Sequence, residues 1–135
     1  MITAVDTSVL IDVFGADARF GAPSANALRL SLNEGAVVAC DVVWSETRGA
    51  FASDEAFLQA LRALGIGFSA LTEPAATLAG VTWKKYRAGG GKRERVIADF
   101  LIGAHAASQC DRLLTRDRGY YKKYFSGLAV IDPSP

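Results

Sequence analysis

Acidic side chains that follow short apolar runs are the residues of this chain best suited to chemistry. Three acids share that position: Asp6 after Ile2–Val5, Asp41 after Ala36–Cys40 and Asp117 after Leu113–Thr115. Short apolar runs of this kind predict buried strands. Because the carboxyl ends of parallel strands lie along one edge of a sheet, where ligands bind in open α/β folds, acids from distant parts of the chain are expected to converge there.

Two further acids fall close to the same predicted edge. Asp99 lies near the start of a predicted helix, Val96 to Ser108, which is apolar nearly all round and is therefore expected to be buried. The free N–H groups of a first helical turn stabilise a carboxylate, yet a buried Asp must also be paired or bind a cation. Glu46 lies on the short helix predicted after the second strand.

Several carboxylates with no histidine triad and no cysteine nucleophile favour a hard divalent cation. Mg²⁺ and Mn²⁺ prefer oxygen ligands, and Mg²⁺ usually keeps several of its waters. Two such ions about 3.5–4 Å apart would clamp a phosphodiester during an in-line displacement. Taken singly, each acid has a simpler explanation, such as a helix cap, so the prediction of a metal site rests on their joint placement.

Strand and helix patterns alternate along the chain and would position these acids. The predicted strands are Ile2–Val5, Ala36–Cys40, Ile66–Leu71, Leu113–Thr115 and Leu128–Ile131. The predicted helices are Ser8–Phe14, Ser24–Glu34, Val42–Ala50, Asp54–Leu64 with Ser53 as its cap, Thr72 to about Arg87, Val96–Ser108 and Tyr120–Phe125. Such alternation predicts an α/β fold with a parallel sheet and helices on both faces.

Length and composition bound the class of protein. A chain of 135 residues, half of them apolar, is expected to form a single domain over residues 1–135 with a real core. Cys40 and Cys110 stand far apart without a C-x-x-C pattern, which predicts free thiols in a reducing cytoplasm rather than a zinc site or a disulfide framework. No secretory signal or membrane-length apolar run is recognised, so no membrane partner is expected.

The charge is divided between the two halves of the chain. Residues 1–83 hold four Arg and nine acids, whereas residues 84–135 hold eleven Lys and Arg and five acids. The split indicates either an acidic site rimmed by a basic surface or solvated faces of different sign. One basic group lies around the glycine run: Lys84, Lys85, Arg87, Lys92, Arg93 and Arg95. The other is expected near Asp117, where it would bind substrate phosphates: Arg112, Arg116 and Arg118, with Lys122 and Lys123.

The remaining polar and aromatic residues are predicted to be structural. Asp12 is expected to be solvated or to cap a helix, because the helix turns it away from Asp6. Asp41 is expected to cap the next helix, with a place behind the metal ligands as the alternative. His105, the single histidine, is predicted to be a hydrogen-bonded core residue rather than a general base. Core or interface packing, rather than stacking on bases, is predicted for the aromatic set Trp44, Trp83, Tyr120, Tyr121 and Tyr124.

Taken in order, these motifs resemble those of a known family. They are Asp6-Thr7-Ser8-Val9-Leu10-Ile11-Asp12, Glu46, the segment from Asp99 to Ala106, and Leu113-Leu114-Thr115-Arg116-Asp117. The set is similar to the motifs of PIN-domain ribonucleases, and the segment from Asp117 to Phe125 resembles the bacterial VapC-type toxins among them. The resemblance implies a three-layer α/β/α sandwich around a small parallel sheet. It also implies a metal-dependent endoribonuclease that uses Mg²⁺ or Mn²⁺.

The resemblance assigns residues to the family site. Asp6, Glu46, Asp99 and Asp117 match its first to fourth acids, which hold the metal, and Ser8 matches a polar residue that assists the first acid. Many relatives carry another acid shortly after the fourth, where this chain has Arg118-Gly119-Tyr120. The resemblance further implies an RNA substrate, a homodimer and an inhibitory VapB-like antitoxin.

Two rival functions remain open at this point. A phosphatase or receiver domain on a related fold would need a nucleophilic Asp followed by a D-x-D pattern, which Asp6-Thr7-Ser8 does not supply. A catalytically silent module that binds RNA or a partner protein would share the fold without the activity, and an assay of metal-dependent RNA cleavage separates it from the enzyme.

Overall fold

A five-stranded sheet forms the centre of the molecule in the computed structural model, which describes residues 1–90 and 97–133. Its strands are β1 (Ile2–Val5), β2 (Ala36–Cys40), β3 (Ile66–Ser69), β4 (Arg112–Leu114) and β5 (Ala129–Ile131). They lie in the order β3-β2-β1-β4-β5, and every pair is parallel. The predicted parallel α/β sheet is therefore confirmed.

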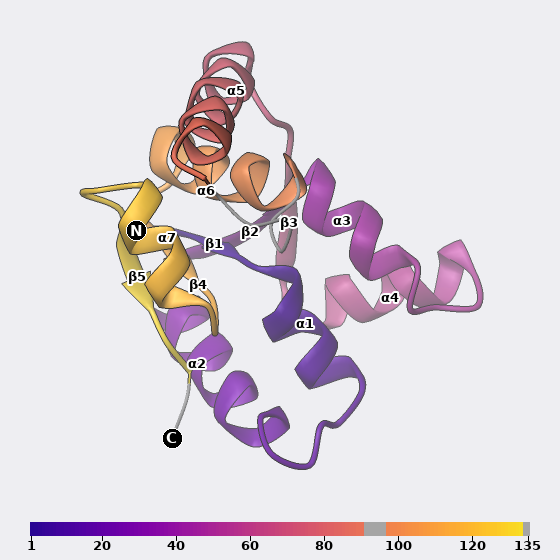
Figure 1. The fold of residues 1–135 in the computed structure, drawn as a ribbon. Coiled ribbons are helices and arrows are strands. Elements are labelled where there is room, and N and C mark those ends of the chain that lie inside the picture. The colour runs from indigo at the N-terminus through magenta and orange to yellow at the C-terminus, as the bar shows by residue number, and fades with distance from the viewer. Residues whose placement is uncertain (91–96, 134–135) are drawn as a thin grey trace.

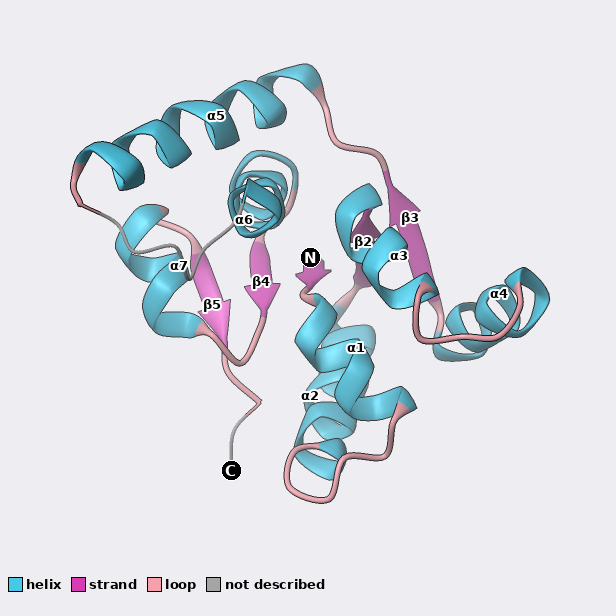
Figure 2. Cartoon of the chain, turned by 45° about the vertical axis from the view of Figure 1, so that its right-hand side comes forward, coloured by secondary structure: helices cyan, strands magenta, loops and turns pink. Residues whose placement is uncertain are grey.

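Helices cover both faces of this sheet (Figure 1). They are α1 (Thr7–Phe14), α2 (Gly21–Glu34), α3 (Asp41–Arg48), α4 (Asp54–Leu64), α5 (Glu73–Ala88), α6 (Ile97–Gln109) and α7 (Arg118–Tyr124). The paired helices α5 and α6 lie on one face and α2 on the other, as both views show (Figures 1 and 2). The strand order accounts for helices on both faces, because the chain runs outward from β1 to β3 and then returns to β4 on the other side of β1.

Strand β1 lies at the centre of the sheet, with one hydrogen-bonded strand on each side. Ala4 pairs with Val38 on one side and with Leu113 on the other. Parallel strands buried on both faces are apolar almost throughout, which explains the runs seen in the sequence. Leu28 of α2 and Phe100 of α6 fill the two halves of the core, and both are fully buried. Tyr120 and Tyr124 of α7 pack against Phe100, and Tyr121 packs against Tyr120, which confirms the core or interface packing predicted for these residues.

Most predicted element ends agree with the structure to within one residue, and two of the larger differences have local causes. The Ser53 hydroxyl accepts a hydrogen bond from the Ala56 N–H at 3.1 Å and caps α4 as predicted. Helix α2 begins at Gly21, three residues earlier than expected, because the Gly21 N–H already bonds to the Asp17 carbonyl at 2.9 Å. Strand β3 ends at Ser69 rather than Leu71, whose N–H instead donates to the Asp41 carboxylate at 3.1 Å.

Some predictions concern residues that the structure does not describe. The predicted helix start at Val96 and the basic residues Lys92, Arg93 and Arg95 lie outside the described residues. In the ranges 1–90 and 97–133, Cys40 is buried, Cys110 is half-buried and neither forms a disulfide. None of the helices in these ranges combines the length and the apolar character needed to cross a membrane.

Candidate active site

The loops at the carboxyl ends of β1 and β4 open a pocket of about 480 Å³ between neighbouring strands. The chain leaves β1 toward one side of the sheet and returns to β4 on the other, which makes this the switch point where open α/β sheets bind ligands. Its lining, as far as the structure describes the chain, consists of Asp6, Thr7, Ser8, Glu46, Asp99, Ile102, Arg116 and Asp117. The four predicted acids and Ser8 are thus brought together from four separate segments.

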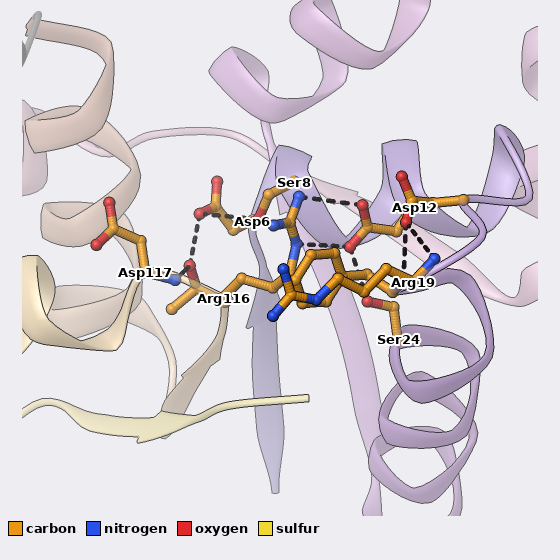
Figure 3. Close-up of polar contacts among 10 residues, drawn as sticks. Asp6, Ser8, Asp12, Arg19, Ser24, Arg116 and Asp117 are labelled. Carbon is orange, nitrogen blue, oxygen red and sulfur yellow. Dashed lines mark hydrogen bonds and ion pairs between the residues drawn. The ribbon is translucent and has the colours of Figure 1, made fainter. Parts of the chain in front are cut away.

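A single threonine hydroxyl aligns the first and fourth acids. The backbone N–H of Asp6 donates to the Leu114 carbonyl at 2.9 Å, which fixes Asp6 beside the end of β4. Thr115, fully buried, donates its hydroxyl to Asp6 Oδ2 at 2.7 Å and accepts the Asp117 N–H at 3.0 Å (Figure 3). The Ser8 hydroxyl stands 3.5 Å from the same Asp6 oxygen, a long contact. Thr115 therefore couples the placement of two acids that lie far apart in the chain.

Asp6 is under electrostatic strain in this pocket. Burial raises the pKa of its carboxyl, and the nearby carboxylates of Asp99 and Glu46 add to the rise. The hydrogen bonds from Thr115 and from the Thr7 N–H offset only part of that effect. A buried carboxylate among like charges is stabilised by binding either a proton or a cation, so the pocket favours the binding of a cation.

The other three acids approach the pocket from different elements. Glu46 projects from α3, is exposed, and its Oε1 accepts a hydrogen bond from the Thr7 hydroxyl at 2.7 Å. Asp99 lies half-buried in the first turn of α6. Asp117 immediately precedes α7, and its side chain makes no capping bond to that helix. The Glu46 carboxylate is therefore held by Thr7, and the Asp117 carboxylate does not cap α7.

The donor set of the pocket suits a hard divalent cation. Carboxylate and hydroxyl oxygens line it, with no imidazole or thiol among the lining residues. Within the described ranges, no three such acidic side chains stand close enough to form a ready-made ligand shell. Mg²⁺ binds through one or two carboxylates and keeps several waters, so the residues fit a largely hydrated ion.

The chain matches the PIN domain family over residues 3–126. It belongs to the PIN domain family. A comparison with curated protein sequences found no match. The fold is shared with solved VapBC structures and with a toxin–antitoxin complex, all at low sequence identity.

Three of these structures illustrate how fully the fold is shared. VapBC2 from Rickettsia felis, bound to a DNA fragment from its promoter, superposes with a TM-score of 0.76 at 15% identity, covering 98% of both chains. VapBC-1 from nontypeable Haemophilus influenzae gives 0.74 at 22% identity, again over 98% of both chains. A toxin–antitoxin complex from Klebsiella pneumoniae gives 0.65 at 18% identity, covering 97% of both.

The three arginines expected near the fourth acid of this PIN domain do not share one location. Arg116 lines the pocket. Arg112 lies at the opposite end of β4, where its Nε donates to the Thr3 hydroxyl at 2.8 Å and its Nη1 contacts Glu34 at 2.9 Å. The expectation that Arg112 lies near Asp117 is therefore wrong, because β4 separates the two. The side chain of Arg118 lies outside the described residues.

Two predictions about the other aspartates of the PIN domain are also wrong. Asp12 is not solvated: it is 3% exposed and pairs with Arg116, whose Nε lies 2.7 Å from its Oδ2 (Figure 3). Asp41 does not cap α3, since the cap position is Cys40 and the Asp41 carboxylate instead accepts the Leu71 N–H. Both carboxylates bind groups that are distant in the sequence, and the hydrophobic periodicity of the sequence cannot indicate such partners.

His105 confirms its prediction as a core histidine. Its side chain is buried, and its Nε2 lies 2.9 Å from the Ser69 hydroxyl. Burial lowers the pKa of the imidazole, so the ring is neutral at pH 7. It does not line the acidic pocket.

Thr115 and Thr7 are the site residues that the sequence did not single out. One feature of the sequence could have indicated Thr115: its hydroxyl group follows a buried apolar run directly and precedes Asp117 by two residues. Thr7 stands in the first motif without an assigned role, and its hydroxyl donates to Glu46.

Proposed function

We propose that this chain is a metal-dependent endoribonuclease and the toxin component of a type II toxin–antitoxin pair. The observation that carries the proposal is the convergence of four carboxylates on one pocket, with the buried first acid held by Thr115. Asp6, Glu46, Asp99 and Asp117 would hold Mg²⁺ or Mn²⁺. A cation bound there would supply the acidity that lets water attack an RNA phosphodiester.

Other residues of the pocket would orient the four acids and contact the substrate. Thr115 orients Asp6 and holds the Asp117 backbone, so both acids keep their positions without metal. Thr7 steers Glu46 toward the pocket, and Ser8 lies beside Asp6 to assist it. Among the described residues, Arg116 is the basic residue that lines the pocket, and it would meet a substrate phosphate there.

Cleavage of RNA with and without metal tests the activity. Purified protein is incubated with RNA in Mg²⁺, in Mn²⁺ and in EDTA, and the products are resolved on a denaturing gel. We expect cleavage in either metal, none in EDTA, and none by Asp99→Asn. Glu34→Gln, whose ion pair with Arg112 lies at the opposite end of β4, is the matched control and should cleave normally.

A negative result has a defined meaning. If wild-type protein binds RNA but cleaves none in either metal, the chain is a silent binding module. If Asp99→Asn cleaves as fast as wild type, the assignment of the third acid fails.

An antitoxin is the partner that this function requires, and we propose that it is VapB-like. The Klebsiella pneumoniae neighbour is described as a toxin–antitoxin complex. A mostly apolar hollow of about 410 Å³ between α3 and α4 would receive an amphipathic segment of such a partner; its lining is Trp44, Ser45, Arg48, Asp54, Phe57 and Leu58. Trp44 and Phe57 form its floor with rings 5.3 Å apart, edge to face. Co-expression with the small reading frame adjacent to the gene, followed by co-purification, tests this partner.

We also propose that the toxin is a homodimer, as the family resemblance implies. Light scattering coupled to size-exclusion chromatography measures its mass directly. A mass near 14.3 kDa at all concentrations would contradict the dimer.

A further inference from the structure

Asp12 is a buried carboxylate that belongs to neither the core nor the four-acid pocket. Its side chain is 4% exposed, and both of its oxygens are engaged. Oδ2 accepts the Ser24 hydroxyl at 2.9 Å and lies 2.7 Å from Arg116 Nε, while Oδ1 accepts Arg116 Nη2 at 3.1 Å. The hydrogen bond from Nη2 and the close ion pair at Nε, which lacks hydrogen-bond geometry, hold two of the three guanidinium nitrogens against Asp12.

Phe20 supports the same guanidinium from its flat face. The Arg116 guanidinium carbon lies 4.2 Å from the centroid of the Phe20 ring, within cation–π range. Asp17 holds this phenylalanine in place, because its Oδ1 accepts the N–H groups of both Arg19 and Phe20, at 2.9 and 2.8 Å. The α1–α2 connection is thus shaped to present a ring under an arginine that comes from the other end of the chain.

The pair leaves one edge of Arg116 for a ligand. Nε and Nη2 are occupied by Asp12, and in the described part of the chain no hydrogen bond or ion pair reaches Nη1. A planar guanidinium bonded along one edge directs its remaining nitrogen away from that edge. Arg116 lines the acidic pocket, and its side chain as a whole is 32% exposed.

The pair also keeps the arginine off the metal-binding acids. Arg116 is next to Asp117 in the chain, and a free guanidinium would neutralise the carboxylates that a cation needs. Figure 3 shows its side chain extending toward Asp12 instead, on the far side of the view from Asp117. Asp12 therefore separates a fixed positive group from a cluster of negative ones.

We propose that Asp12, with Phe20, is a positioning residue that holds Arg116 at the rim of the pocket to bind a backbone phosphate of the RNA. The inference rests on the proposed ribonuclease function and adds the device that places the RNA next to the four acids. It makes a prediction of unusual sign: removing a negative charge weakens the binding of a polyanion. A carboxylate that merely stabilised the fold would do the reverse.

Binding of RNA without metal tests the inference. Fluorescein-labelled, mixed-sequence single-stranded RNA is titrated with protein in EDTA at several salt concentrations, and the Kd and its salt slope are measured. Arg116→Gln should weaken binding about tenfold, the scale of one charge-assisted contact, and lower the slope by roughly 0.7 for the phosphate lost. Asp12→Asn should change both in the same direction, and the double variant should be no worse than Arg116→Gln.

Matched variants separate positioning from charge and from folding. Glu34→Gln removes the same charge from another arginine pair, at the far end of the sheet, and should bind RNA at least as well as wild type. Circular dichroism confirms that each variant is folded. If Asp12→Asn does not fold, Phe20→Leu decides: it should weaken binding roughly two- to fivefold and add nothing to Arg116→Gln.

The possible results separate the positioning role of Asp12 from the proposed ribonuclease activity. Unchanged or tighter binding by folded Asp12→Asn, or by Phe20→Leu in its place, overturns the positioning role while cleavage by wild type leaves the ribonuclease intact. Wild-type protein that neither binds nor cleaves RNA overturns both.

Discussion

Replacing Asp6 by Asn should stabilise the metal-free protein while abolishing cleavage. Burial and the neighbouring carboxylates raise the pKa of Asp6 above its ordinary value of 3.8, so the ionised form is disfavoured in the folded state. Asparagine keeps an oxygen that accepts the Thr115 hydroxyl and carries no charge. A variant that is more stable and inactive is the expected signature of a residue kept for function.

The sign of the effect follows from the link between pKa and stability. A carboxyl whose pKa is raised on folding costs stability whenever it is ionised, and removing its charge recovers that cost. Asp6 is only 8% exposed, so solvent screening does little to reduce the effect. A higher Tm for Asp6→Asn than for wild type is therefore expected at pH 7 in EDTA.

Metal should reverse the order of the two proteins. A cation present at about 100 times its Kd stabilises the folded wild type by about 2.7 kcal/mol, because it binds the folded state alone. Asp6→Asn lacks a ligand and should gain much less. Differential scanning calorimetry measures the Tm of both proteins in EDTA and then in Mn²⁺. Asp6→Asn should have the higher Tm in EDTA, and wild type should have the higher Tm in Mn²⁺.

The pH dependence has a definite sign. A carboxyl whose folded pKa is raised binds its proton more tightly when folded, so protonation favours the native state. The advantage of Asp6→Asn over wild type should be full above the folded pKa, shrink as the pH falls through it, and vanish below about 3.8. Subtracting the two stability curves removes the titration of all other groups.

Two results would refute this reasoning. A lower Tm for Asp6→Asn than for wild type in EDTA at pH 7 would show that the ionised carboxylate is stabilising there. Equal responses of the two proteins to Mn²⁺ would show that Asp6 is not a ligand. Asp54→Asn, whose side chain is 85% exposed, is the control for loss of one surface charge and should shift Tm by little.

Three further outcomes are expected. Thr115→Val should lower the unfolding free energy by about 2 kcal/mol and weaken Mn²⁺ binding by calorimetric titration, because it removes the hydroxyl that Asp6 shares with the next loop. Gly103→Ala should destabilise by about 1–3 kcal/mol in urea unfolding, because the new Cβ would clash with the Phe125 ring; Gly80→Ala, with open space around it, should be neutral or stabilising by comparison. An antitoxin peptide that inserts Arg or Lys toward the four acids should inhibit less as Mn²⁺ rises, whereas inhibition that is insensitive to Mn²⁺ and survives replacement of every basic residue would leave occlusion of the α3–α4 hollow as the explanation.

The sequence by itself determined the class of fold and the edge at which chemistry would lie. Short apolar runs of three to six residues alternate with helical patterns, and this alternation predicts a parallel sheet between helices. Once the strands are parallel, an acid after one strand must lie at the same edge as an acid after another. Asp6 and Asp117 were predictable in this way, since only local pattern and strand direction are needed.

Tertiary structure alone decided which polar groups meet. Asp41 follows a strand just as Asp6 does, yet its carboxylate bonds to the Leu71 N–H, while Glu46, further along the same helix, lines the pocket. Periodicity indicates which face of a helix is buried and contains nothing about the partner across the core. Hydrogen bonds act over about 3 Å, so their partners are fixed only when packing brings distant segments together.

The pairing of Asp12 with Arg116 shows most clearly what the sequence alone could not predict. The two residues are separated by 104 positions, and a charge on a short helix normally indicates solvent. The sheet order places the end of β4 beside the end of β1, and only then does the arginine that follows β4 reach the helix that follows β1. A buried charge needs a partner of opposite sign, and the physical reason for burying Asp12 became visible when the fold supplied one.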